Sequence, residues 1–518
     1  MANTAAGQGG GDAIRSIAIV GGGTAGWMAA SYLARTLAHA NLDITLIDSS
    51  EIGTVGVGEA TVPAIRDFLK AVGLTEAEVL DATEGTIKLG IHFADWAEPG
   101  HRFYHPFGLY GVPARGVPFH HYWLKLRAAG HEVPLADYCL CTQLAEHDRF
   151  LAPPERPGSD LGVFDFALHF DASKFATVLR DLSLSGGVTH LDGRIEAVEQ
   201  DPQNGRVRAV KLADGRRVAA DLWIDCSGFR GLLIGEAMGV PFIDWRKWLP
   251  CDRAIALGCE PVDAYRPVTT STARAAGWQW HIPLRHRIGN GYVYCSDHIE
   301  DDAAEAVLRA NIEGAALGEA RRIRFTPGHR DRFWKGNVVA IGLAGGFLEP
   351  LESTSITLIQ SGLERLVRLF PDRGFDPALA TLFDRQSRLE FERIRDFLLL
   401  HYCLNRRLGE PLWDRMRTME LPEALQAKID AWRAQGELVR YEWETFQDPS
   451  WLSMYAGFDL YPRRYSIRAD QFDVAELRST FERMRAAIGD TVRLGVPGHA
   501  FATQLPQRQT GMPRQFAR

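Results

Sequence analysis

The first apolar positions of the chain fall into two short runs on either side of a helix-forming stretch. Residues 16–20 (SIAIV) predict a buried strand, and residues 27–37, which are rich in alanine and leucine, predict a helix. A glycine-rich turn at residues 21–26 (GGGTAG) joins them, and a second strand is predicted at residues 43–47. Strand, glycine turn, helix and strand in this order predict a Rossmann-type βαβ unit.

This turn has the spacing of a dinucleotide-binding site. Its G-x-G-x-x-G motif would let backbone N–H groups approach a pyrophosphate at the helix N-terminus, and an acid about twenty residues later can hold a ribose hydroxyl. A tight turn without a ligand is the alternative, but the complete strand, turn and helix favour a cofactor. The predicted cofactor residues here are Gly21, Gly23, Thr24, Ala25, Gly26 and Asp48. No second motif of this kind follows a predicted strand, so we expect no nicotinamide site.

The rest of the pattern predicts an α/β body followed by helices. Apolar runs at residues 207–212, 222–225 and 291–295, separated by turn residues, indicate mixed sheets with an antiparallel layer. The second of these runs continues into Cys226-Ser227-Gly228, a small-residue turn of the kind that contacts FAD in two-domain flavoproteins. Helical spacing then dominates, as in Phe391, Ile394, Leu398 and Tyr402 and in residues 422–433. We therefore expect a flexible tail at 1–14, an FAD-binding body with an inserted substrate-facing sheet at 15–365, and a mainly helical region at 366–518 that closes the substrate site.

A second glycine-rich segment, residues 340–350, predicts a strand, a flexible loop and a proline that opens a helix continuing to residue 366. Its Gly342 and Leu343 are expected to lie against the flavin. Backbone N–H groups of Thr354 and Ser355, near the helix start, carry a partial positive charge that suits a halide. Simple capping by Ser353 or Thr354, without a ligand, is the alternative.

Two further patterns leave function open. In residues 86–93 the apolar side chains alternate with the others, which puts Lys88 on the opposite face of a strand. A solvated lysine is the ordinary interpretation, because buried unpaired lysine is rare. Trp278 and Trp280 alternate in the same way before Pro283. They either fill the core, as buried aromatics mostly do, or separate a flavin from a substrate.

Composition narrows the class of protein. The chain has 518 residues, of which 46% are hydrophobic and 24% charged, which is typical of a soluble globular protein of more than one domain. A formal net charge of -7 disfavours nucleic acid as a partner. Seven cysteines without paired C-x-x-C elements predict no metal site and favour a reducing cytoplasm. The apolar stretch at residues 338–348 is well short of the roughly 20 residues of a membrane helix, so no membrane association is expected.

Taken together, these motifs match one family in order and over nearly the whole length. They are GGGTAG continuing into WMAA at residues 27–30, GVGEATVP at 56–63, FYHPFG at 103–108, WQWHIP at 278–283 and EPLEST at 349–354. The sequence resembles the flavin-dependent tryptophan halogenases. The resemblance implies that FAD, used as FADH2, together with O2 and a halide (chloride or bromide) gives hypohalous acid. It also implies a separate NAD(P)H-dependent flavin reductase and a monomer or homodimer. A flavin-dependent aromatic hydroxylase and a non-catalytic FAD-binding protein are the alternatives.

The same resemblance implies roles for individual residues. Lys88 would receive the hypohalous acid, by hydrogen bonding or as a haloamine. Glu352 would orient the halogen species or take the proton of the halogenated ring. Trp278 and Trp280 would form a partition that keeps the substrate away from the flavin. Thr354 and Ser355 would bind the halide, and the substrate residues would be His105, Phe107 and Glu59.

Two departures from the family pattern bear on the substrate. Thr354-Ser355 stands where the family usually has Thr-Gly, which keeps the backbone donors and bears on halide preference. The C-terminal region lacks the paired tyrosines and Asn-rich stretch that hold free tryptophan in the family, and has Tyr441-Glu442-Trp443 and Asp448-Pro449-Ser450-Trp451 instead. We therefore expect indole or another electron-rich aromatic, including a peptide side chain, with Trp451 as the stacking partner.

Overall fold

The computed structural model describes residues 12–51, 58–131, 133–262 and 265–505, so most of the tail predicted at 1–14 lies outside the described residues. A six-stranded sheet of order β21-β22-β13-β1-β2-β9 forms the cofactor-binding body, and all its strands except β21 are parallel. The bounds are β1 Ser16–Val20, β2 Asp43–Asp48, β9 Thr189–Asp192, β13 Leu222–Asp225, β21 Trp334–Lys335 and β22 Val338–Ala340. The predicted βαβ unit is therefore confirmed, with α1 (Thr24–Thr36) as its helix.

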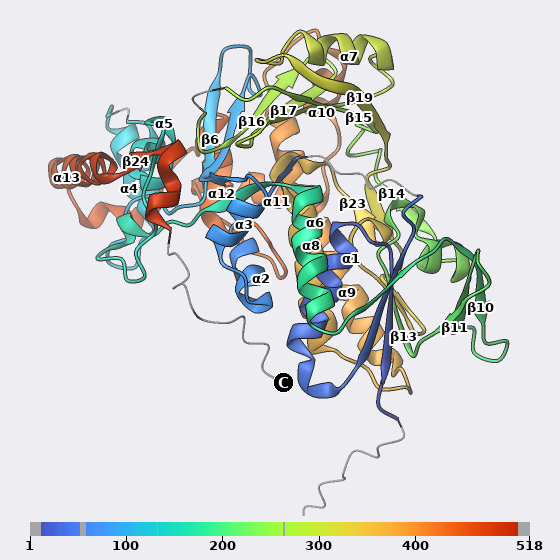
Figure 1. The fold of residues 1–518 in the computed structure, drawn as a ribbon. Helices are drawn as coiled ribbons and strands as arrows, with labels where there is room; N and C mark the ends of the chain where they lie inside the picture. Colours follow the sequence, from blue (N-terminus) through green and yellow to red (C-terminus); the bar gives the residue numbers. More distant parts are fainter. Residues whose placement is uncertain (1–11, 52–57, 132, 263–264, 506–518) are drawn as a thin grey trace, which may run out of the picture.

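The central strands β1, β13 and β22 are mostly apolar because both of their faces are covered. Ile17 and Ile19 of β1 face the core shared with the helices, whereas Ala18 and Val20 face a second core on the other side. Figure 1 shows α1, α6 (Ala172–Ser185) and α8 (Thr354–Arg368) on one side of these strands. A three-stranded sheet covers the other side, formed by β10 (Ile195–Gln200), β11 (Val207–Leu212) and β12 (Arg217–Ala219).

The antiparallel layer predicted for the body is a seven-stranded sheet of order β19-β15-β18-β17-β16-β5-β6. Its pairs are antiparallel except β16 with β5. The bounds are β5 Gly90–Ala94, β6 Arg102–Pro106, β15 Arg253–Cys259, β16 Thr269–Arg274, β17 Gly277–Pro283, β18 Ile288–Tyr294 and β19 Ala316–Arg324. Helix α7 (Asp301–Arg309) covers one end of it (Figure 1).

Residues 86–93 do not form the single strand that their alternation predicts. They form β4 (Thr86–Lys88), which pairs with β8 (Ala167–Asp171), and β5, which belongs to the seven-stranded sheet. The chain changes sheets at Leu89, whose N–H donates to Pro267 instead of to a ladder partner. A side chain at the next position, Gly90, would overlap the backbone of His105. The β4-β8 pair is completed by β3 (Gly58–Ala60).

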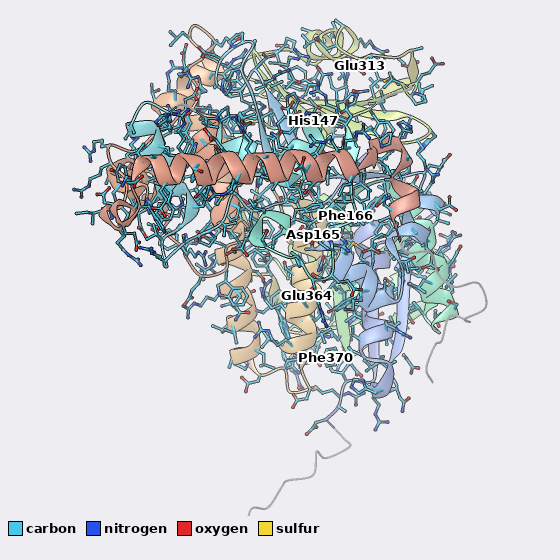
Figure 2. All side chains as sticks on the ribbon, turned by 90° about the vertical axis from the view of Figure 1, so that its left-hand side faces the viewer. His147, Asp165, Phe166, Glu313, Glu364 and Phe370 are labelled. Carbon is cyan, nitrogen blue, oxygen red and sulfur yellow. The ribbon has the colours of Figure 1, made fainter. Side chains whose placement is uncertain are left out.

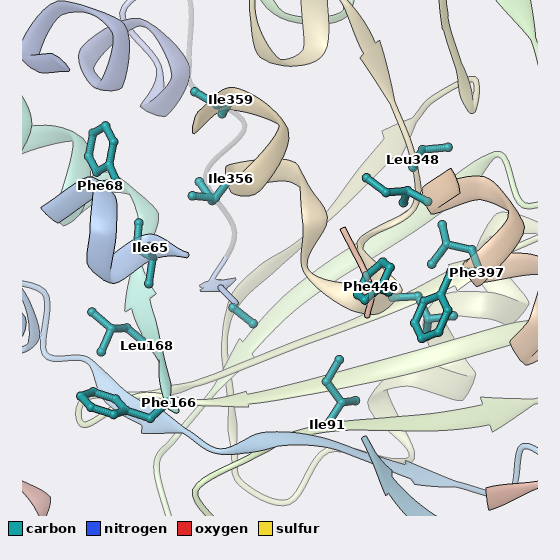
Figure 3. Close-up of a cluster of buried hydrophobic side chains, with 14 of the residues drawn as sticks. Ile65, Phe68, Ile91, Phe166, Leu168, Leu348, Ile356, Ile359, Phe397 and Phe446 are labelled. Atoms are coloured by element: carbon teal, nitrogen blue, oxygen red, sulfur yellow. The ribbon is translucent and has the colours of Figure 1, made fainter. Parts of the chain in front are cut away.

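Smaller elements complete the body. The strands of two minor sheets are β14 Phe242–Asp244, β20 Gly328–Arg330 and β23 Gly346–Phe347, and β7 Arg149–Phe150 with β24 Val496–Pro497. The short helices are α2 Ile65–Val72, α3 Glu76–Ala82, α4 Phe119–Ala128 and α5 Leu140–Glu146. Figure 3 shows how Ile65 and Phe68 of α2 and Ile356 and Ile359 of α8 contribute to one buried cluster with Leu168 of β8.

The region after residue 366 is mainly helical, as predicted. Its helices are α9 Pro377–Cys403, α10 Pro411–Thr418, α11 Glu423–Gln435, α12 Asp448–Gly457 and α13 Val474–Leu494. The four apolar residues that predicted α9 are all buried. Helix α13 lies across one face of the molecule (Figure 2) and packs on α4, where Phe481 stacks on Phe119 at 4.7 Å. The predicted boundary at 365/366 falls inside α8, so the division into domains stays a prediction.

Within the described ranges, no helix combines the length and the apolar character that crossing a membrane requires.

Candidate active site

A cavity of about 490 Å³ opens where the carboxyl ends of β1, β2 and β13 meet the N-terminus of α1. This is the crevice in which parallel α/β sheets bind dinucleotides. The predicted residues Gly21, Gly23, Thr24, Ala25, Asp48, Gly342 and Leu343 line it, together with Cys226, Ser227 and Gly228. The cavity therefore brings together the three segments that predicted a flavin site, although Gly21 and Leu343 lie more than 300 residues apart in sequence.

The glycines of the turn have separate structural reasons. Gly21 has a φ of +110°, which is unfavourable for other residues, and Gly26 packs so closely on the backbone of Gly21 that a side chain there would overlap it. Gly23, the residue preceding α1, has open space where a Cβ would stand. That space lies in front of the helix N-terminus, where a pyrophosphate would accept backbone hydrogen bonds. The residues present thus fit FAD.

Asp48 ends β2 and lies at the cavity, as predicted. Nε2 of His190, on the neighbouring strand β9, lies 2.7 Å from Asp48 Oδ1 and orients the carboxylate. The imidazole also packs edge-on against Trp27 of α1, with ring centroids 5.3 Å apart. Sequence reasoning missed His190, because the register that pairs β9 with β2 is not visible in the sequence.

The segment from Pro350 to Ile356 departs from its predicted form. Pro350 opens a short 3-10 turn (Pro350–Glu352) and not the helix itself, because Ser353 adopts a left-handed conformation with φ of 60° and α8 begins only at Thr354. The kink divides the segment between two environments. Pro350, Ser355 and Ile356 line the cofactor cavity, whereas Glu352 and Ser353 are buried beside Lys88.

The start of α8 is not capped in the ordinary way. Ser353 occupies the N-cap position without accepting a hydrogen bond from the helix. Thr354 is fully buried, and its Oγ1 has no hydrogen-bond partner among the described residues. Simple capping, the alternative interpretation, is thus not what these side chains do. A buried hydroxyl donor at a helix N-terminus next to the cofactor cavity suits an anion.

Lys88 is buried with no exposed surface, which overturns the solvated position that strand alternation favoured. It is buried because β4 lies between the sheets and both of its faces are covered. Its Nζ donates to Ser353 Oγ at 2.9 Å and lies 5.4 Å from the ring of Phe107. Burial lowers the pKa of Lys88 to about 7, although Glu352 raises it. The amine can therefore lose or gain its proton much more readily near neutral pH than an exposed lysine.

Glu352 is also fully buried and is held by two histidines. His105 Nδ1 of β6 lies 2.8 Å from Oε2, and His401 Nε2 of α9 lies 2.7 Å from Oε1. Burial raises the pKa of Glu352, but the charges and hydrogen bonds of His105 and His401 outweigh it and lower the pKa to about 2. His401 was missed from the sequence, where the one sign is a histidine inside the apolar run FLLLHYCL of residues 397–404.

The two tryptophans lie on the same face of β17, as their alternation predicted, with ring centroids 6.2 Å apart. Trp280 lines the cofactor cavity, and Trp278 is 1% exposed and contacts Trp96 deeper in the core. Gly291 on the neighbouring strand leaves room for the indole of Trp280, because a Cβ there would overlap that ring. The pair thus forms a continuous aromatic layer inward from the cavity.

Aromatic rings surround the Lys88 and Glu352 side. Around His105 lie the rings of Phe107, Phe397 and Phe446, with centroids at 6.4, 5.6 and 6.0 Å. Phe397 and Phe446, which Figure 3 shows side by side, stack at 4.0 Å, and sequence reasoning missed both. Trp451 contacts Phe397 edge-on at 5.2 Å.

Trp451 and Glu59 are the two remaining residues that were predicted to contact the substrate. One face of the Trp451 ring is covered by Lys428, whose Nζ lies 4.2 Å from the ring centre. Lys428 is itself paired with Glu444 at 2.8 Å. Glu59 lies on β3, opposite Phe170 of β8, and its backbone position alone is described. The substrate roles of both residues stay predictions.

Known proteins of one family share this sequence and fold. The family model described as tryptophan halogenase matches residues 16–474. The 7-chloro-L-tryptophan 6-halogenase KtzR of Kutzneria sp. is 38% identical over 446 residues, covering 80% of this chain and 84% of the relative. Tryptophan 7-halogenase RebH of Lentzea aerocolonigenes is also 38% identical, over 440 residues.

Solved structures agree with these relatives. BrvH, a flavin-dependent halogenase from Brevundimonas sp. BAL3, superposes with a TM-score of 0.92 at 51% identity, covering 95% of this chain and 99% of BrvH. The tryptophan 6-halogenase SttH of Streptomyces toxytricini gives a TM-score of 0.87 at 34% identity, covering 95% and 99%. The chain belongs to the tryptophan halogenase family and is a flavin-dependent halogenase that uses FADH2, O2 and halide.

Proposed function

We propose that this halogenase transfers halogen to an indole-type aromatic ring through Lys88 and Glu352. The observation that carries the proposal is the segment from Pro350 to Ile356. It lines the cofactor cavity at Pro350 and Ser355 and, within the same few residues, presents Glu352 and the Ser353 partner of Lys88 to a dry interior. A hydroxylase would need no such buried pair of lysine and carboxylate.

Bound reduced FAD, with O2, supplies the oxidising equivalents that convert a halide into hypohalous acid. The halide is held by the backbone N–H groups of Thr354 and Ser355 and by the Thr354 hydroxyl, which has no partner among the described residues. Trp278 and Trp280 exclude the aromatic substrate from the cofactor cavity. The small oxidant, and not the substrate, therefore moves between the two sites.

In the buried site, the Lys88 ammonium donates a hydrogen bond to the oxygen of hypohalous acid. As the ring carbon forms its bond to the halogen, the halogen–oxygen bond breaks, and the Lys88 proton converts the departing hydroxide to water. The Glu352 carboxylate takes the proton from the substituted carbon, and the electron pair of that C–H bond restores aromaticity. Lys88 has lost one proton and Glu352 has gained one, so both recover by exchange before the next cycle.

The surroundings of His105 support an apolar aromatic substrate. Phe107, Phe397 and Phe446 offer ring faces and edges, and stacking holds a ring with one edge toward Lys88 and Glu352, so the halogenated position follows from the pose. KtzR and RebH are named for action on tryptophan or chlorotryptophan. Here Lys428 and Glu444 neutralise one another, which favours indole, or an indole side chain, over the free amino acid.

A separate NAD(P)H-dependent flavin reductase completes the proposed system, because the sequence has a single G-x-G-x-x-G turn after a strand. A cytoplasmic location, which supplies NAD(P)H, fits this requirement.

One assay tests the proposal. The protein is incubated with FAD, a flavin reductase, NADH, O2 and bromide or chloride, with indole or free tryptophan as substrate, and product masses are read. We expect monohalogenated indole with the halogen isotope pattern, formed faster than halogenated tryptophan. An added oxygen in place of halogen, or equal use of both substrates, contradicts the proposal.

A further inference from the structure

The hydrogen bonds around Glu352 fix where protons lie in this part of the core. Glu352 and His401 have no exposed surface, and His105 is 2% exposed. Both groups are therefore shielded from bulk solvent, and each short polar contact between nitrogen and oxygen needs a proton of its own. The contact of His401 Nε2 with Glu352 Oε1, at 2.7 Å, is the one whose proton is not obvious.

The other ring nitrogen of His401 settles that question. His401 Nδ1 lies 2.8 Å from the carbonyl oxygen of Phe397, one turn earlier in α9. A carbonyl only accepts, so Nδ1 carries a hydrogen, and a neutral imidazole has just one N–H. Turning the ring over would replace both contacts by C–H groups, so this orientation is fixed. The contact with Glu352 therefore contains one shared proton, in an imidazolium–carboxylate pair or in a neutral histidine–carboxylic acid pair.

We propose that His401 is a positioning residue, an imidazolium whose charge keeps Glu352 ionised and aimed at the substrate site. The assignment rests on the proposed function, because only an ionised Glu352 can take the ring proton. The direction of the pKa of Glu352, lowered to about 2 against the effect of burial, agrees with it. Other titratable groups near the pair are Lys88 of β4, His105 of β6, His169 of β8 and Glu349, which interacts with Tyr402 beside His401.

The substitution His401→Gln separates charge from hydrogen bonding. The glutamine amide can still donate to Glu352, but it cannot become a cation. Without that charge, burial raises the pKa of Glu352, because His105 alone is left to oppose it. We expect bromination of indole at pH 7 to fall about 100-fold, the scale of one lost acid–base group. We also expect the rate of His401→Gln to fall further as the pH is lowered below 7, an acid limb set by protonation of Glu352 that the wild type lacks.

Controls distinguish this effect from damage to the fold. His120 of α4 is a buried histidine that contacts the Gly436 carbonyl oxygen at 2.9 Å, so His120→Gln is the matched substitution, for which we expect the wild-type profile. His401→Gln should bind FAD like the wild type and unfold in a single cooperative transition, at a lower temperature because the buried ion pair is lost. A variant with the wild-type rate, or with a lower rate and an unchanged pH profile, overturns the assignment and leaves His401 a structural residue.

A measurement without turnover tests the same assignment even if indole is not the substrate. Infrared spectra of the protein at pH 7 report protonated carboxyl groups. We expect His401→Gln to have stronger carboxylic acid absorption than the wild type, and we expect the added absorption to disappear in the double variant with Glu352→Gln. A wild-type carboxylic acid band that Glu352→Gln removes would show the opposite proton position. Failure of indole halogenation alone would instead count against the proposed function.

Discussion

The ammonium of Lys88 donates a 2.9 Å hydrogen bond to the hydroxyl of Ser353, the residue that separates Glu352 from the first turn of α8. One left-handed residue thereby connects the proposed oxidant-binding lysine, the proposed proton acceptor and the helix N-terminus of the proposed halide site.

We expect the buried Lys88 side chain to lower the stability of the folded protein. Lys88→Met removes a buried cation. The Glu352 carboxylate is not left without partners, because it keeps its contacts with His105 and His401. We expect the free energy of unfolding at pH 7 to rise by about 1–4 kcal/mol. Urea denaturation measures it. The matched variant Lys125→Met, which removes a buried lysine paired with Asp470 at 2.9 Å, should be less stable than the wild type.

The stabilisation by Lys88→Met should shrink as the pH rises. The pKa of Lys88 is about 7 in the folded protein and about 10.4 in the unfolded chain. Between these values the unfolded state binds one more proton, so wild-type stability rises with pH by up to about 1.4 kcal/mol per pH unit. Urea denaturation at pH 7 and at pH 9 measures this effect. The unfolding free energies of Lys88→Met and the wild type should differ by about 2–3 kcal/mol less at pH 9 than at pH 7. If the difference in unfolding free energy is the same at both pH values, the pKa of Lys88 is not lowered in the folded protein.

Cofactor binding depends on the open space at Gly23. Its Cβ would meet no protein atom and its backbone is extended, so Gly23→Ala should fold normally. The added methyl group would occupy the space in front of α1, and we expect FAD affinity, followed by fluorescence titration, to fall at least about tenfold, equivalent to about 1.4 kcal/mol. Gly26→Ala, by contrast, should lower stability as well, because its Cβ overlaps the backbone of Gly21. Wild-type FAD affinity in Gly23→Ala would refute this placement.

The Thr354 hydroxyl should matter for halide and not for folding. It is buried without a partner in the described part of the chain, so Thr354→Val removes an unpaired polar group at no loss to stability. We expect KM for bromide to rise about tenfold, the effect of one hydrogen bond to a charged group, with FAD affinity unchanged. Thr357→Val, one turn further along α8, serves as the control. An unchanged KM for both chloride and bromide would place the halide elsewhere.

The aromatic layer should keep the oxidant inside the protein. Trp280 lines the cofactor cavity, so Trp280→Ala opens a path between that cavity and the layer behind it. We expect more hypohalous acid to escape, measured with an external scavenger, and less halogenated indole per NADH consumed. Trp280→Phe, which keeps an aromatic ring, should retain most of the coupling. Unchanged coupling in Trp280→Ala would leave the tryptophans a purely structural role.

The sequence predicted those parts of the site whose geometry is local. The G-x-G-x-x-G turn and Asp48 lie where strand, turn and helix patterns place them. The kink at Ser353 was not predicted, because a proline at residue 350 is equally compatible with a continuous helix. Lys88 was predicted from alternation alone to be solvated, and only the covering of β4 on both faces buries it.

Long-range contacts account for the rest. His401 approaches Glu352 because α9 packs against β5, where the His401 ring lies 5.0 Å from that of Phe93. Phe446 reaches Phe397 from the segment between α11 and α12. Neither contact leaves a periodic signal, since each depends on how distant elements meet. The alternation of Trp278 and Trp280 predicted a shared face but not that Trp280 borders the cofactor cavity.

The rate of indole bromination by Lys88→Met, measured with FAD affinity on the same preparation, decides whether Lys88 acts on the oxidant. We expect FAD binding as in the wild type, continued consumption of NADH through the reductase, and a rate of indole bromination lower by at least about 100-fold. A folded, FAD-binding Lys88→Met protein that brominates indole at the wild-type rate would contradict this role of Lys88.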